Sequence, residues 1–228
     1  MLALIYDVHG NLPALEAVLA DADEQGAERF LLGGDYVAFG GWPAETLARL
    51  RAIEGAQWIR GNTERWLGDS SELPADAPQQ HALQAARDAL APEDVLALVA
   101  LPEHDEHAGT HFSHASPLND MESFGVESQP DEERLLAGVT DRRVVFGHTH
   151  VQFTRMRDDG IELVNPGSVG IPLDGDPRAA YALIDDEHVL TLRRVAYDHL
   201  AAADHTRTFL GGGAAADMFA GRIASAQL

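Results

Sequence analysis

The chain contains neither cysteine nor lysine among its 228 residues. The absence of cysteine excludes disulfides, thiolate catalysis and cysteine-ligated zinc. The absence of lysine excludes Schiff-base chemistry and the phosphate-binding lysine of a P-loop. All 16 basic residues are therefore arginine, and positive charge offered to a phosphate has to come from arginine or from bound metal.

Positive charge is also scarce overall. The 16 arginines face 37 acidic residues, which gives a formal net charge of −21 at pH 7. A surface of this sign repels nucleic-acid backbones and anionic membranes, so we expect neither as a partner. A small phosphate ester remains compatible with the charge, provided that the site itself holds a local positive centre.

Long apolar runs are missing as well. No stretch is long enough to span a bilayer, and Asp7 and His9 interrupt the apolar N-terminal stretch, so we expect no signal peptide and a cytoplasmic location. Hydrophobic residues still make up 45% of the chain, which is ordinary for a globular protein with a core. Because no repeat or low-complexity linker interrupts it, the sequence predicts one domain over residues 1–228, with about 206–228 as a C-terminal helical extension.

Short apolar runs alternate with helical patterns in the first part of the chain. The runs at 2–6, 29–32 and 57–60 each lead into a turn signal, and helical spacing follows at 12–26 and 44–54. Such a β-α-β-α-β series predicts parallel strands joined by right-handed crossovers.

The rest of the chain mixes helices with hairpins. We expect residues 116–129 to form a flexible flap, because they show no period. Glycines at 211–213 break the last helical stretch. The remaining predicted elements are helices at 81–90, 92–100 and 131–137, strands at 103–107, 110–114 and 143–146, hairpin strands at 152–157 with 161–164 and 181–185 with 188–197, and helices ending near 205 and 224.

Acidic, amide and histidine side chains follow the predicted strands. Ligands in open α/β sheets bind just beyond the carboxyl ends of strands, so these positions are where chemistry is expected. Two pairs have i, i+2 spacing, which points both side chains the same way in an extended chain. The side chains at strand ends are Asp7, His9, Asp35, Asn62, His114, His148 and His150.

Four histidines crowd the stretch between residues 104 and 114. His104 and His107 fit an exposed strand with alternating polar residues. His114 lies nearest a strand end and is the best ligand candidate, and His111 comes second.

The donor set favours transition metals. Four imidazoles with two carboxylates and one amide suit divalent first-row ions, whereas Mg²⁺ and Ca²⁺ prefer oxygen ligands. Seven ligands are too many for one tetrahedral site but fit two adjacent metals that share one carboxylate. We therefore expect two divalent ions, manganese first among them, with iron, zinc, nickel or cobalt as alternatives.

The order of these motifs resembles the calcineurin-like metallophosphoesterase superfamily, and especially its small prokaryotic phosphodiesterases. The motifs are Asp-x-His, Gly-Asp, Gly-Asn, His and Gly-His-x-His, and the stretches at 7–12, 165–170 and 195–198 are also similar to that subgroup. The resemblance covers nearly the whole chain. It implies an α/β fold, a four-layer α/β/β/α sandwich of two mixed sheets.

The same resemblance implies residue roles. The first metal would be held by Asp7, His9 and His150. The second would be held by Asn62, His114 and His148. Asp35 would bridge the two, since a carboxylate has two oxygens for two cations. By position, catalysis is expected from Asp35, Asn62 and His148, and substrate binding from Arg60, Asn11 and Thr63.

The resemblance implies hydrolysis of phosphate esters, phosphodiesters first, by in-line attack of a hydroxide held between the metals. The chain departs from the family pattern at Thr63, where the usual residue is a histidine that protonates the leaving group. A threonine hydroxyl is a poor acid at neutral pH, so another histidine or water replaces it, or the enzyme prefers good leaving groups. The alternatives are a non-catalytic metal-binding scaffold on the same fold, and a dinucleotide polyphosphate hydrolase or protein phosphatase.

Overall fold

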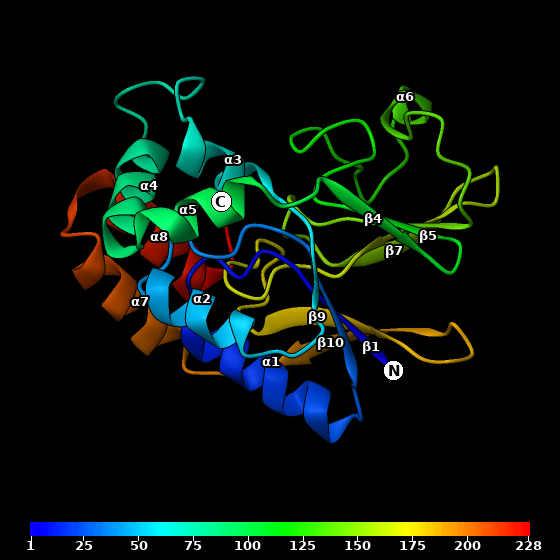
Figure 1. Cartoon of the computed structure of the whole chain (residues 1–228), viewed down its shortest axis with the longest axis horizontal. Helices are drawn as coiled ribbons and strands as arrows, with labels where there is room; N and C mark the ends of the chain where they lie inside the picture. Colours follow the sequence, from blue (N-terminus) through cyan, green and yellow to red (C-terminus); the bar gives the residue numbers. More distant parts are fainter.

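The structure, a computed structural model, describes residues 1–228. Its strands form two five-stranded mixed sheets, which confirms the predicted fold class (Figure 1). In the first sheet β1, β2 and β3 are parallel, as predicted, and β9 and β10 are antiparallel to their neighbours. Its order is β10 (Leu190–Val195), β9 (Ala179–Ile184), β1 (Leu2–Ile5), β2 (Arg29–Leu32) and β3 (Gln57–Trp58).

The second sheet has a parallel centre between two antiparallel edges. Strands β5, β6 and β8 are parallel, and β4 and β7 each form a hairpin with a neighbour. The two predicted hairpins are confirmed, as β7 with β8 in this sheet and β9 with β10 in the first. The order is β4 (His104–His107), β5 (Thr110–Ser113), β6 (Arg143–Val145), β8 (Glu162–Asn165) and β7 (Phe153–Met156).

The side chains along β1 alternate between two separate hydrophobic cores, one on each face of the first sheet. Leu4 and Tyr6 face the second sheet and pack with Phe112, Val145 and Val164. Ala3 and Ile5 face the opposite way, into the core under the helices. Because side chains alternate between the two faces of a strand, one apolar run supplies both cores.

Helices from both ends of the chain cover the outer face of the first sheet, on the left of Figure 1. Their buried residues join those of β1 and β9 in one cluster of 35 side chains. These helices are α1 (Leu12–Glu24), α2 (Pro43–Arg51), α3 (Asn62–Gly68), α4 (Pro78–Ala89), α5 (Pro92–Val99), α7 (His199–Phe209) and α8 (Gly213–Ser225).

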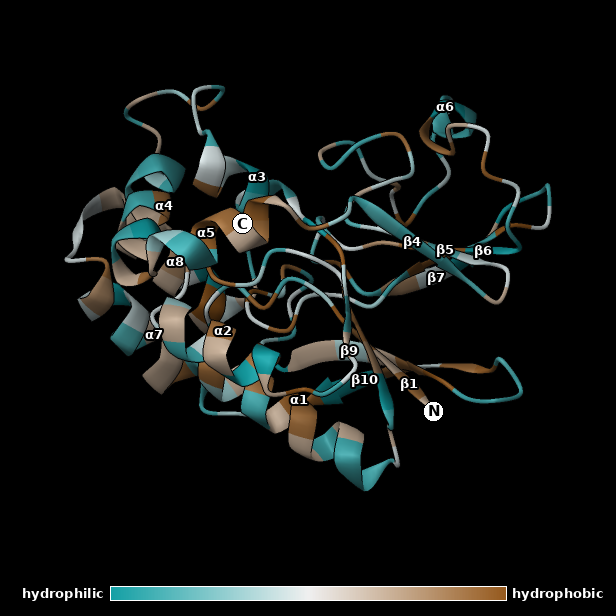
Figure 2. Cartoon of the chain, in the orientation of Figure 1, coloured by the Kyte–Doolittle hydropathy of each residue, from teal (hydrophilic) through white to brown (hydrophobic).

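The outer face of the second sheet has a thinner cover. One short helix, α6 (Glu132–Leu135), and the irregular segment before it bury Phe124 and Leu135 against Val144 and Phe146. Residues 116–129 contain no helix or strand, which fits their lack of period, and their flexibility stays a prediction. Strand β4 at the sheet edge is hydrophilic (Figure 2), which protects an exposed edge from pairing with another chain.

Several helix boundaries differ from the sequence prediction. Helix α3 was not predicted, because a glycine-led polar segment after a strand is typical of a loop. Helix α4 begins at Pro78, three residues early, because proline fits the first helical turn where its missing N–H costs nothing. Helix α7 continues past the predicted end to Phe209. No helix has the length and apolar character needed to cross a membrane.

Candidate metal centre

The seven predicted donors come together where strands of both sheets end. Residues after β1, β2 and β3 of the first sheet meet residues after β5 and β6 of the second. Six of the seven are buried, and His148 is partly exposed. His111 is not part of the group, because its ring lies beside Glu106, with Nδ1 3.3 Å from Oε1.

The first cluster consists of Asp7, His9 and His150. The Nε2 atoms of the two histidines lie 3.0 Å apart. Asp7 Oδ1 lies 3.8 Å from His9 Nε2 and 3.4 Å from His150 Nε2. These three residues are the ones that the resemblance places around the first metal.

The second cluster is centred on Asn62. Its Oδ1 lies 2.9 Å from His114 Nε2 and 2.9 Å from His148 Nδ1. Asp35 lies between the clusters, with Oδ1 3.5 Å from His114 Nε2 and Oδ2 3.7 Å from His9 Nε2. Asp7 also reaches the second cluster, since its Oδ1 is 3.9 Å from His114 Nε2.

The i, i+2 interpretation assumed that the paired donors lie on extended backbone, and the structure shows that they do not. Five of the donors have positive φ angles between 49° and 66°, in the left-handed region that non-glycine residues rarely adopt. Each such residue costs on the order of 1–3 kcal/mol and persists where surrounding structure holds it, often at functional sites. The convergence therefore comes from sharp turns after the strands. The five are Asp7, His9, Asp35, His148 and His150.

Two glycines allow the carboxylates to approach the neighbouring loops. A Cβ atom at Gly147 would overlap Asp7 Oδ2, and one at Gly61 would overlap Asp35 Oδ1. Both positions therefore need a residue without a side chain.

Backbone carbonyls orient three of the imidazoles. The Nδ1 atom of His9 lies 3.1 Å from Ala38 O, that of His114 2.9 Å from Gly33 O, and that of His150 2.6 Å from Ile171 O. A ring that donates from Nδ1 has its lone pair on Nε2, so these bonds fix the tautomer. The Nε2 lone pairs of His9 and His150 then face each other at 3.0 Å, an arrangement that a cation between them would stabilise.

Asp7 supplies a buried oxygen that no group of the protein satisfies. Its Oδ2 accepts a hydrogen bond from the His148 backbone N–H at 3.0 Å, whereas Oδ1 has no hydrogen-bond partner. A buried carboxylate oxygen without a partner is costly unless it binds a cation. Together with the facing histidines, this oxygen shows that the residues fit a divalent metal group.

Burial and charge interactions among the side chains of the cluster shift their pKa values. Burial alone would raise the pKa of Asp7, but contacts with His150, His114 and His9 lower it below the ordinary value. Burial lowers the pKa of His9, and burial with the charge of His114 lowers that of His148 to about 4. These two rings are neutral at pH 7, the form that binds metal.

Asn11 and Thr63 are buried and bonded to other parts of the protein, and their predicted role in substrate binding stays a prediction. Asn11 is fully buried, and its Nδ2 donates to Gly170 O at 2.8 Å and to Tyr197 Oη at 3.0 Å. Thr63 is also fully buried, and its N–H and Oγ1 donate to Asp35 Oδ1 at 2.9 and 2.8 Å. Asn11 therefore joins two loops, and Thr63 orients Asp35 so that Oδ2 is its freer oxygen.

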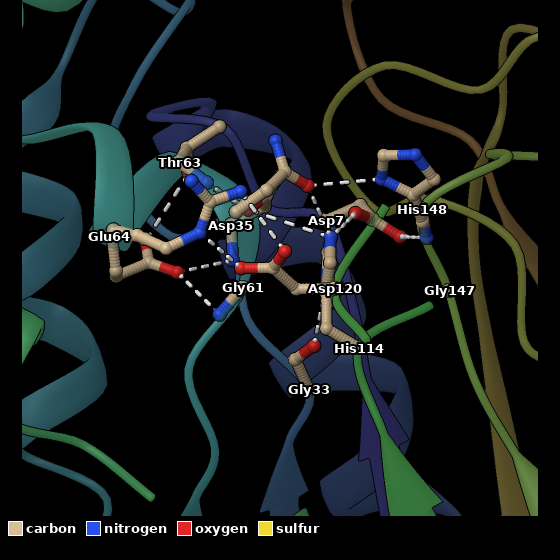
Figure 3. Close-up of polar contacts among 12 residues, drawn as sticks. Asp7, Gly33, Asp35, Gly61, Thr63, Glu64, His114, Asp120, Gly147 and His148 are labelled. Carbon is tan, nitrogen blue, oxygen red and sulfur yellow. Dashed lines mark hydrogen bonds and ion pairs between the residues drawn. The ribbon is translucent and has the colours of Figure 1, made fainter. Parts of the chain in front are cut away.

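Glu64 is a supporting residue that the sequence analysis missed. Its carboxylate accepts hydrogen bonds from the backbone N–H groups of Asp35, Tyr36 and Gly61 at 2.8–2.9 Å, as Figure 3 shows for Gly61. Burial, together with the charge of Asp35, raises the pKa of Glu64 to about 7. A glutamate three residues after Gly61 fits the N3 position of a capping box, which was the available sequence signal.

The loop over residues 165–170 supports the metal-binding loops from behind. Asn165 Nδ2 donates to Gly147 O at 3.0 Å, and Ser168 Oγ donates to Asp7 O at 2.8 Å. These bonds hold the turns after β1 and β6 against each other, which explains why the segment accompanies the donors in the motif set.

Two cavities of about 140 Å³ flank the cluster. The first, called the aromatic cavity, is lined by five donors together with Phe39, Trp66, Gln79, Ile171, Leu173, Phe219 and Arg222. The second, called the polar cavity, is lined by His114 with Arg60, Arg65, Glu103, His104, Ser113 and residues 116–120. Arg60 thus lies beside the site, but it is ion-paired with Glu103 at 2.5 Å.

A family model described as the calcineurin-like phosphoesterase superfamily domain matches residues 1–188. The chain belongs to the calcineurin-like phosphoesterase superfamily. The chain belongs to this family and its site residues fit divalent metal, so it is a metal-dependent phosphoesterase. Strand β10 and helices α7 and α8 of the phosphoesterase lie beyond the matched range.

Two curated relatives match most of the phosphoesterase. The uncharacterised protein MJ0912 of Methanocaldococcus jannaschii is 28% identical over 217 residues, covering 87% of this chain and 88% of the relative. Phosphodiesterase YfcE of Escherichia coli is 27% identical over 191 residues, covering 79% of this chain and 85% of its own length.

Solved structures share the fold. A metallophosphoesterase from Sphaerobacter thermophilus superposes with a TM-score of 0.83 at 24% identity and covers 99% of both chains. The hypothetical protein PH1004 of Pyrococcus horikoshii gives 0.78 at 22% identity, over 91% of this chain and 93% of its own. Because the first match spans nearly the full length, the C-terminal helices belong to the shared fold.

Proposed function

We propose that the phosphoesterase is a binuclear phosphodiesterase that holds two divalent cations, manganese first among them, with its seven strand-end donors. The single observation that supports this most strongly is Asp7 Oδ1, a buried oxygen with no partner that lies within 3.4–3.9 Å of three histidine Nε2 atoms. One atom that contacts both clusters suits a pair of adjacent cations.

When bound, the cations lower the pKa of a coordinated water and neutralise charge that develops on the phosphoryl group. The protein contributes rigid placement. Backbone carbonyls orient His9, His114 and His150. Thr63 and Glu64 hold the loop that carries Asp35. His148 is the donor most open to solvent, so substrate approaches on its side.

The substrate is proposed to be a small phosphate ester. The relative YfcE is named a phosphodiesterase, and the sequence motifs resemble those of the small prokaryotic phosphodiesterases. Phosphodiesters are therefore the preferred substrates in this proposal. Thr63 is buried and donates to Asp35, so it does not reach a leaving group. Esters with good leaving groups should therefore react fastest. The cytoplasmic location expected from the sequence stays a prediction.

A hydrolysis screen tests the proposal. Chelated protein receives Mn²⁺, Fe²⁺, Zn²⁺, Ni²⁺ or Co²⁺ and is assayed on bis-p-nitrophenyl phosphate, p-nitrophenyl phosphate and a series of aryl diesters with rising leaving-group pKa. We expect metal-dependent turnover, two metals per chain by elemental analysis, faster diester cleavage, and a steep fall in rate along the series.

A matched pair of histidine variants distinguishes the loss of a metal donor from the general effect of replacing a histidine. His150→Asn removes a donor of the first cluster, whereas His107→Asn changes an exposed histidine on β4. We expect His150→Asn to lose turnover by at least about 10²-fold and His107→Asn to keep it. Wild-type protein that binds two metals yet cleaves neither mono- nor diester would contradict the proposal and favour a scaffold.

A further inference from the structure

The C-terminal helices reach the metal centre although they lie outside the range matched by the family model. Phe219 and Arg222 of α8 line the aromatic cavity together with His9, Asp35 and His150. Helix α8 is held there by buried residues, among them Ala216 and Ile223, which pack into the same core as β1. The helix therefore forms a fixed wall of the cavity.

Arg222 is unpaired in a chain where acidic residues are abundant. It is the only one of the 16 arginines whose side chain makes neither a hydrogen bond nor an ion pair, and its Nε is buried without a partner. Even Arg87 and Arg142, which have no carboxylate partner, donate to backbone carbonyls. Burial lowers the pKa of Arg222, but a guanidinium stays charged at neutral pH.

An aromatic column fixes Arg222 relative to a donor of the metal cluster. Phe39 stacks on His9 with ring centroids 5.2 Å apart, and Phe219 stacks on Phe39 at 4.3 Å with an interplanar angle of 7°. The Arg222 guanidinium carbon lies 5.9 Å from the Phe219 ring centroid. The charge is thus placed by stacking contacts, which leave its N–H groups available.

We propose that Arg222 binds a phosphoryl oxygen of the substrate in the aromatic cavity and that α8 thereby supplies part of the substrate site. This inference rests on the proposed function for the identity of the substrate. An arginine with free N–H groups beside a cation site binds an anion that bridges the two charges. The apolar walls formed by Ile171, Leu173 and Trp66 would receive a compact organic group of the ester.

Inorganic phosphate is the probe for this test, because its binding does not require turnover. Its affinity for the manganese-loaded full chain is measured by calorimetry for the wild type, Arg222→Gln, Arg222→Lys and the control Arg207→Gln. Arg207 lies on α7 and pairs with Asp217 at 3.8 Å, outside the cavity. Manganese content and thermal unfolding are measured for each protein.

We expect Arg222→Gln to weaken phosphate binding by about 10- to 100-fold, as for loss of hydrogen bonds to a charged group, with manganese content unchanged. Arg222→Lys should keep part of the affinity, because it retains the charge without the planar fork. On the diester, KM should rise more than kcat falls. Arg207→Gln should match the wild type.

The outcomes separate this inference from the proposed function. Phosphate binding that depends on Arg222 in a protein without turnover would support the inference and reject the phosphodiesterase. Turnover with phosphate affinity unchanged in folded, manganese-loaded Arg222→Gln would overturn the inference alone. If Arg222→Gln does not fold, Arg222→Lys with wild-type phosphate affinity and KM would likewise overturn the proposed role of the guanidinium fork.

Discussion

The aromatic and polar cavities have similar volumes of about 140 Å³, and each borders the metal centre through different donors. Their arginines differ, because those of the polar cavity are ion-paired and that of the aromatic cavity is not. In the polar cavity Arg60 is paired with Glu103, and Arg65 is held by two oxygens of Asp120 at 2.7 and 3.0 Å. In the aromatic cavity Arg222 has no acidic partner. An arginine whose charge is already neutralised gains little from a phosphate, whereas an unpaired one gains much.

The comparison teaches that residue type alone does not locate a substrate site. Arg60 was the predicted substrate-binding arginine because it precedes the Gly61-Asn62 motif in the sequence. It also donates to the Val99 carbonyl at 3.1 Å, so two of its nitrogens are occupied by protein. Arg222, about 160 residues further along the chain, has the free N–H groups that binding needs.

The largest expected effect comes from the two carboxylates that contact both donor clusters, Asp7 and Asp35. Asp7→Asn and Asp35→Asn each remove a negative charge that contacts histidines of both clusters, so both should lose metal and lower kcat by at least about 10²–10³-fold. His148→Asn removes one terminal donor and should cost less. Metal content and kcat are measured together. Near-wild-type values for Asp35→Asn would contradict its bridging role, which stays a prediction.

A second prediction uses the different protonation of the two clusters. Burial alone would lower the pKa of His114, but the Asp35 and Asp7 carboxylates raise it above the ordinary value, whereas the pKa of His9 is lowered. A raised pKa keeps a proton on His114 until a higher pH, and metal has to displace that proton. Metal affinity at the His114 cluster should therefore rise with pH and level off above this pKa.

Manganese titrations of chelated protein at about pH 6 and about pH 8 measure this difference. We expect one equivalent to weaken by up to about tenfold per pH unit on acidification, and the other to change less. His114→Asn should remove the steeper dependence. Two equivalents with the same pH dependence would show that the clusters do not differ in this way.

The sequence predicted the positions of the donors because each follows a local pattern, an apolar run that ends in a polar turn. It did not predict their backbone, since left-handed φ angles at Asp7 or His148 are rare for such residues and are imposed by neighbouring loops. The prediction of a single domain stays a prediction. The shared core of β1, α7 and α8 supports it.

The missed residues all depend on contacts far apart in the chain. Glu64 accepts hydrogen bonds from residues 28 and 29 positions away. Arg222 is distinguished by the lack of an ion-pair partner. This lack depends on where the fold places all the acidic residues of the chain, which the sequence does not show. The residues three and four positions from Arg222 in the sequence, Met218, Phe219, Ser225 and Ala226, carry no charge, which was the only sequence signal for it.

The smallest expected effect comes from freeing the arginine of the polar cavity. Glu103→Gln removes the partner of Arg60 and should strengthen phosphate binding by about two- to threefold, because Glu103 is 72% exposed and such a pair is weak. Calorimetry with inorganic phosphate on manganese-loaded protein measures it. Glu127→Gln is the control, since it removes one negative charge from an exposed residue without an ion pair.

The double variant Glu103→Gln with Arg60→Gln decides the cause. If the freed guanidinium is responsible, the gain disappears in the double variant, and Arg60→Gln alone leaves phosphate binding near the wild-type value. If Arg60→Gln alone weakens binding as strongly as Arg222→Gln, ion pairing does not decide which arginine receives the anion, and the contrast between the two cavities fails.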